Sequence, residues 1–161
     1  MKHGMLKLGA MICVVALCLG VFAGCANPAS NGDSAQQANR TYMSKVNGIM
    51  EQLGDDLKSF SDAVSRGDVV NMRTQANNAY RSLDELSKLE APEELADVKQ
   101  SYVDGANKLR SALDEYIELF TEVDAGSFDQ STYSSRLASV QKLYDEGVEL
   151  LKKGDETAAN K

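Results

Sequence analysis

The stretch that decides the fold is LADVKQSYVDGANKLRSALDEYIELFTEV, residues 95–123. Its apolar residues recur every three or four positions, which is the period of one face of an α-helix. These residues are Leu95, Val98, Tyr102, Ala106, Leu109, Leu113, Tyr116, Phe120 and Val123. The pattern predicts one long amphipathic helix, the longest of the chain. Nothing elsewhere in the sequence alternates with the period of two that a β-strand requires.

Two segments with the same helical period precede this stretch. The first begins at Ser34, which forms a capping-box pattern with Gln37, and is expected to end at Gly67. The second follows Asp68, a residue type that caps helix N-termini. Pro92 then interrupts the apolar pattern at a position suited to the first turn of the next helix.

One segment with the helical period follows. Gly126 breaks the long helix, and Phe128, Asp129 and Tyr133 fit a hydrophobic staple around the start of another. We expect this last helix to stop at Gly154. The sequence therefore predicts an all-α domain, an antiparallel up-down-up-down four-helix bundle over residues 34–154, with a disordered tail at residues 155–161.

The N-terminal residues carry a different pattern. A basic start, MKHGMLK, is followed by an apolar run over residues 8–24 that ends in Val-Phe-Ala-Gly before Cys25. This layout resembles the signal peptide and lipobox of a bacterial lipoprotein, with Phe22 where Leu is usual. The resemblance implies that residues 1–24 are removed and that Cys25 carries a diacylglyceryl thioether and further acyl chains such as palmitate. Residues 25–33 would then be the lipidated cysteine and a flexible tether.

Two other interpretations of the N-terminus stay open. The 17 apolar residues sit at the short edge of the roughly 17–25 that span a bilayer, so an uncleaved anchor is one alternative. Ordinary cleaved secretion is the other. As a lipoprotein, the chain is expected on the extracytoplasmic face of the cell membrane, or at an outer membrane where the organism has one.

The amino-acid composition excludes several classes of function. Removal of residues 1–24 would take away Lys2 and Lys7, leaving 15 basic and 24 acidic residues, a net charge of −9. Such a domain repels nucleic acid, so its membrane contact would come from acyl chains. His3, the only histidine, would leave with the signal peptide, which excludes His-dependent nucleophiles and zinc sites. We therefore expect no enzyme and no cofactor other than the covalent lipid on Cys25.

Acidic residues gather where the third and fourth helices are expected to meet. They are Glu115, Glu118, Glu122, Asp124 and Asp129. Three of them share one face of the long helix, and in an up-down bundle this end lies away from the tether. One hypothesis is that these residues bind a basic protein partner or a divalent cation. The alternative is an ordinary solvated helix end.

Five tyrosines fall on the apolar stripes: Tyr42, Tyr102, Tyr116, Tyr133 and Tyr144. We expect them at the edge of the core, with hydroxyl groups that reach water. The leading functional prediction is a non-enzymatic interaction or sensing module of the bacterial envelope. The alternative is a bundle that holds a small apolar or aromatic molecule between its helices, in a space lined by Tyr102, Tyr116 and Tyr144. A carboxylate-based hydrolase stays open only formally, and the oligomeric state is open.

Overall fold

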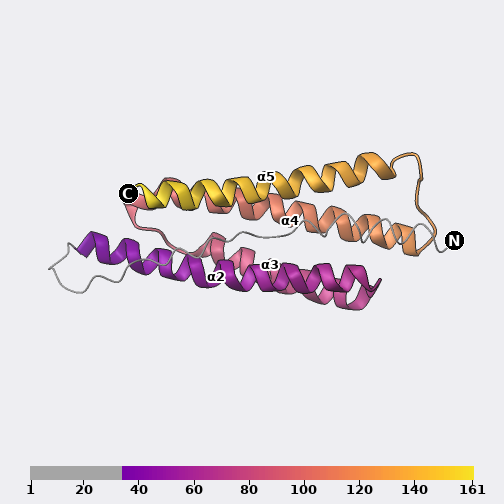
Figure 1. Cartoon of the computed structure of the whole chain (residues 1–161), viewed down its shortest axis with the longest axis horizontal. Helices are drawn as coiled ribbons and strands as arrows, with labels where there is room; N and C mark the ends of the chain where they lie inside the picture. Colours follow the sequence, from indigo (N-terminus) through magenta and orange to yellow (C-terminus); the bar gives the residue numbers. More distant parts are fainter. Residues whose placement is uncertain (1–33) are drawn as a thin grey trace.

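The computed structural model describes residues 34–161. Four α-helices and one short 3₁₀ segment make up this region, and no strand occurs in it. The helices are α2 (Ser34–Ser65), α3 (Val69–Lys88), α4 (Ala96–Asp124) and α5 (Tyr133–Ala159), and the segment η1 (Glu93–Leu95) precedes α4. Figure 1 shows them as two layers of paired helices, α2 with α3 and α4 with α5. The expected all-α helical bundle is confirmed, but the expectation that residues 95–123 form the longest helix is wrong, because α2 has 32 residues and α4 has 29.

Side-chain hydrogen bonds between the helices define their directions. Asn39, near the start of α2, donates to Glu94 of η1 at 3.1 Å. The Lys161 ammonium reaches Asp97, in the first turn of α4, at 2.7 Å. Arg73, near the start of α3, donates to Thr121, near the end of α4, at 3.1 Å. Consecutive helices therefore run antiparallel, and the α2–α3 turn lies at the same end as the α4–α5 loop (Figure 1).

Glycines in the left-handed region end two of the helices. Gly67 has φ 64° and Gly126 has φ 67°, which side chains with a Cβ adopt at a cost. After α4, the Gly126 N–H donates to Val123 and the Ser127 N–H donates to Glu122, the two bonds of a Schellman motif. Gly67 closes α2 in the same way. Both expected helix ends are confirmed because the signal for each is local.

The start of α5 differs from the expectation. Phe128 and Tyr133 do stack edge to face, with ring centroids 5.2 Å apart. Asp129, however, does not cap α5, because its carboxylate accepts from the backbone N–H and the hydroxyl of Ser131 instead. The helix begins four residues after Asp129, at Tyr133. The aromatic contact predicted from the sequence is present, whereas the prediction that Asp129 caps the last helix is wrong.

The core lies along α4, which packs against α5 on one side and against α3 on the other. Its largest side chains with almost no exposure are Tyr102, Leu53, Met72, Leu83, Leu86, Leu95, Leu109 and Leu119. Burying a side chain of this size stabilises the fold by roughly 1.5–3 kcal/mol. α5 contributes little to this set: Leu151 is its one large buried hydrophobic side chain among the described residues.

Three glycines let α4 and α5 approach closely. A Cβ on Gly105 would lie 2.9 Å from the carbonyl oxygen of Gly147, and one on Gly154 would lie 2.8 Å from the ring of Tyr102. The expectation that Gly154 stops the last helix is therefore wrong. Gly154 is a buried packing position inside α5, and the helix continues to Ala159 through the residues expected to be a disordered tail.

Candidate functional site: the distal acidic end and the tyrosine cluster

The three glutamates of α4 in the predicted site, Glu115, Glu118 and Glu122, have their partners on α5. Arg136 pairs with Glu122 at 2.5 Å and reaches Glu118 at 3.8 Å. Glu115 accepts a hydrogen bond from the hydroxyl of Ser139 at 2.9 Å. The sequence argument grouped the three glutamates correctly on one face but missed Arg136, which stands between two of them.

Solvent exposure separates these glutamates. The side chain of Glu118 is 69% exposed, whereas that of Glu122 is 33% exposed. The partners of Glu115 and Glu122 lie within the bundle, so these carboxylates hold α4 to α5. Ion pairs with this degree of exposure contribute at most about 1 kcal/mol each. Among the three, Glu118 presents its charge most fully to solvent.

The two aspartates of the predicted site lie at the turn between the helices. Asp124 is exposed at the end of α4, and Asp129 is exposed in the following loop. Hydrogen bonds from the Ser131 hydroxyl and N–H hold the pKa of Asp129 below its usual range. We call Glu118, Asp124 and Asp129 the distal acidic end. Within residues 34–161 no group of three or more His, Cys, Asp or Glu side chains is placed to hold a metal ion.

The predicted lipidation site, Cys25, lies outside the described residues, as do the predicted signal peptide and tether. Among the helices that are described, none is long and apolar enough to cross a membrane. The nearest described position is Ser34, the first residue of α2. It lies at the end of the bundle opposite the α4–α5 loop (Figure 1).

The tyrosines are more deeply placed than the sequence suggested. Tyr42, Tyr102 and Tyr116 are each at most 3% exposed, so the expectation that their hydroxyls reach water is wrong. The hydroxyl groups of Tyr42, Tyr116 and Tyr133 are buried and have no hydrogen-bond partner. A buried hydroxyl without a partner costs about 1–3 kcal/mol. Tyr144 is partly buried, and burial raises its pKa to about 12.

One tyrosine makes a hydrogen bond that the sequence did not predict. The Tyr102 hydroxyl donates to Asp155 Oδ1 at 2.6 Å, joining α4 to α5. Burial is the main cause that raises the pKa of Asp155, and the charge of Glu156 adds to it. The place of Asp155 within the last helix could have been predicted from the spacing of Leu151, Gly154 and Ala158. This spacing continues the apolar stripe past the helix end that was expected at Gly154.

Comparison of the chain with protein-family models, with curated proteins and with solved structures finds no match.

Proposed function

We propose that this protein is a lipid-anchored extracytoplasmic protein of a bacterial envelope that acts as a non-enzymatic interaction module. Two features support the proposal. The first is the lipobox-like sequence that ends at Cys25, which supplies an attachment point. The second is the length of the bundle, which separates Ser34, the first described residue, from the distal acidic end (Figure 1).

The separation between the two ends is the observation that carries the proposal. α2 has 32 residues, which corresponds to a length of about 48 Å. The nine residues from Cys25 to Asp33 extend at most about 30 Å. An anchor at Cys25 would therefore keep Ser34 within about 30 Å of the membrane, while the distal acidic end lies about 48 Å from Ser34 along α2.

The charge of the distal acidic end indicates the kind of partner. Glu118, Asp124 and Asp129 are all exposed there. Arg136 of α5 pairs with Glu122 at 2.5 Å and, of these three acids, reaches only Glu118, at 3.8 Å. Without residues 1–24 the protein has a net charge of −9, so together with this surface it attracts a basic protein surface and repels anionic lipid headgroups. In this proposal, the module holds a basic envelope protein away from the membrane surface.

The anchor is tested by the intact mass of the protein extracted from native membranes. The expected mass is that of residues 25–161 plus acyl chains, and the Cys25→Ala variant is expected to lose both the acyl mass and membrane retention. Protease treatment of intact cells checks the extracytoplasmic orientation. An unmodified full-length mass would contradict lipid anchoring and support an uncleaved anchor.

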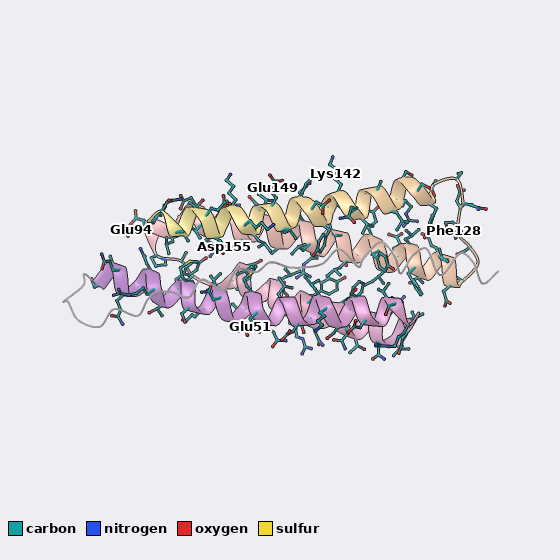
Figure 2. All side chains as sticks on the ribbon, viewed as in Figure 1. Glu51, Glu94, Phe128, Lys142, Glu149 and Asp155 are labelled. Atoms are coloured by element: carbon teal, nitrogen blue, oxygen red, sulfur yellow. The ribbon has the colours of Figure 1, made fainter. Side chains whose placement is uncertain are left out.

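The interaction surface is tested separately by in vivo cross-linking. A Glu118→Lys/Asp124→Lys variant is expected to lose its main cross-linked partner, and the loss should be mimicked by high salt. The matched control is Glu149→Lys, which reverses an exposed acid on the outer side of α5, far from the α4–α5 loop (Figure 2). Equal cross-linking by the distal variant and the control would refute an acidic docking end.

A further inference from the structure

The exposed face of α3 differs in charge from the rest of the domain. The chain has 24 acidic residues, yet none lies between Asp68 and Asp84, and α3 carries Arg73 and Arg81 in this interval. Five exposed side chains share this face at helical spacing: Val70, Arg73, Thr74, Asn77 and Arg81. We call them the arginine face of α3. It is a basic and polar surface on a domain in which acids outnumber bases.

The two arginines have only neutral partners within the described residues. Arg73 donates to the hydroxyl of Thr121 at 3.1 Å, and Arg81 donates to the side-chain oxygen of Asn78. None of the salt bridges within residues 34–161 involves either guanidinium, although other arginines of the domain form ion pairs. Because acids are in excess, two exposed arginines without a carboxylate partner are not what the composition alone would produce.

The acids that border the arginine face are engaged in other contacts. The carboxylate of Asp68 accepts a hydrogen bond from the N–H of Asn71 at the start of α3. Asp84 pairs with Arg110 of α4, and Asp114 of α4 accepts a hydrogen bond from a tyrosine hydroxyl of α3. These contacts occupy the bordering carboxylates, so the positive charge of the arginine face is directed to solvent.

An apolar side chain lies on the same face. Val70 is 76% exposed, and it is the one exposed large hydrophobic side chain among residues 34–161. A single exposed apolar residue is ordinary on a protein surface, but this one lies one helical turn before Arg73. Protein–protein interfaces are enriched in arginine next to apolar contacts. A phosphate polymer or a lipid headgroup would use the arginines and gain nothing from Val70.

We propose that the arginine face of α3 binds an acidic segment of another protein that carries an apolar side chain. Each guanidinium can donate two parallel hydrogen bonds to a carboxylate, and Val70 supplies the apolar contact. Arg73 and Arg81 are separated by about 12 Å along the helix axis, which matches two acids about four residues apart in an extended segment. The negative charge of the rest of the domain is screened by salt beyond about 8 Å. This face has the opposite charge to the distal acidic end, so the two surfaces take different partners.

The test is an NMR titration of the full-length protein with two peptides of equal length. The first consists of repeats of Glu-Glu-Leu-Ala, and the second has Gln in place of every Glu. We expect the Glu peptide to shift the amide signals of residues 70–81 and to bind at least about tenfold more tightly than the Gln peptide, because the Gln peptide cannot accept charge-assisted hydrogen bonds. Equal affinity of the two peptides, shifts confined to other helices, or no binding of the Glu peptide at about 10 mM would overturn the proposal.

Charge reversals locate the site. Arg73→Glu/Arg81→Glu is expected to weaken binding of the Glu peptide at least about tenfold. The matched control is Lys142→Glu/Lys152→Glu, which changes the net charge equally at exposed positions of α5, where Figure 2 labels Lys142. The control should weaken binding less than about threefold, because charges far from the contact are screened. Circular dichroism establishes that both variants are folded, and equal losses would overturn the proposal because net charge alone would then govern binding.

A third variant separates an acidic protein segment from other anions. Val70→Ser keeps both arginines and removes the apolar contact, so it is expected to weaken binding of the Glu peptide about threefold. Inorganic polyphosphate is the comparison probe, and it should bind the wild type more weakly than the Glu peptide does. Tighter binding of polyphosphate, or no effect of Val70→Ser on the Glu peptide, would overturn the assignment to an acidic protein segment.

Discussion

The close contact of α4 with α5 makes a sharp prediction about two glycines. At Gly105 an added Cβ would lie 2.9 Å from the backbone carbonyl oxygen of Gly147 and 2.9 Å from a methyl carbon of Leu151. A flexible side chain can move away, but a backbone oxygen moves only if the helix moves. At Gly48, on the exposed side of α2, nothing lies within 4 Å of an added Cβ. Gly105→Ala and Gly48→Ala therefore make the same change inside a helix, at a position without space for the added methyl group and at a position with space for it.

The magnitudes follow from two competing effects. Replacing glycine by alanine in a helix interior stabilises it by about 1 kcal/mol, because alanine loses less backbone entropy on folding. Gly48→Ala should show this gain alone. At Gly105 the added methyl also forces the two helices apart, and overpacking of this kind costs about 1–3 kcal/mol. The two variants should therefore differ in free energy of unfolding by about 1–3 kcal/mol, with Gly105→Ala the less stable.

Urea and thermal denaturation followed by circular dichroism measure this difference. For a domain of this size each kcal/mol shifts the midpoint temperature by about 3–5 °C, so the variants should be separated by at least a few degrees. Equal shifts for Gly105→Ala and Gly48→Ala would refute the reasoning, because they would mean that α4 and α5 do not approach as closely as the glycines indicate.

Three further predictions concern polar contacts. Ser82→Ala removes the hydroxyl that donates to Asp56, a carboxylate between α2 and α3 that is 7% exposed. The variant should lower the free energy of unfolding by about 1–3 kcal/mol, as measured by urea denaturation. A negligible loss would contradict a buried acceptor. Arg136→Ala should lower the free energy of unfolding by at most about 1 kcal/mol, and this loss should become smaller when salt is added. A loss that salt does not change would contradict an ionic contact. Because burial raises the pKa of Asp155 above its ordinary value of 3.8, stability is lost as pH rises through the folded-state pKa. The midpoint temperature of the Asp155→Asn variant should therefore rise relative to that of the wild type when the pH is raised from about 3 to about 7. The same difference between variant and wild type at both pH values would contradict this prediction.

The sequence predicted the features whose causes are local. Gly67 and Asp68 lie next to each other, and together they end one helix and begin the next: Gly67 by its positive φ, and Asp68 by accepting a hydrogen bond from the Asn71 N–H. The apolar spacing of residues 95–123 predicted the long helix because burial of one face is the dominant favourable term in folding. Such signals are complete within a few residues, and the sequence contains all of them.

The features that the sequence did not predict depend on contacts between helices. Asp84 and Lys108 each have an opposite charge four residues away, Lys88 and Asp104, yet their partners are on other helices: Asp84 pairs with Arg110, and Lys108 with Glu146 at 2.7 Å. A spacing rule within one helix cannot identify these partners. The same limit applies to the partner of Glu122 and to the hydrogen bond between Tyr102 and Asp155.

Gly154 shows why the end of the last helix was misassigned from the sequence. A glycine near the end of an apolar pattern usually marks a helix stop, but here Tyr102 occupies the space that a side chain would fill. A Cβ on Gly154 would lie 2.8 Å from the ring of Tyr102, whose hydroxyl donates to Asp155, the residue that follows the glycine. Among the described helices, α4 and α5 pack against each other most extensively. Interaxial distance follows the size of the side chains at the contact, so Gly105, Gly147 and Gly154 allow α4 and α5 to approach closely. The glycine that looks like a helix stop in the sequence is therefore a position that the packing of α4 against α5 requires.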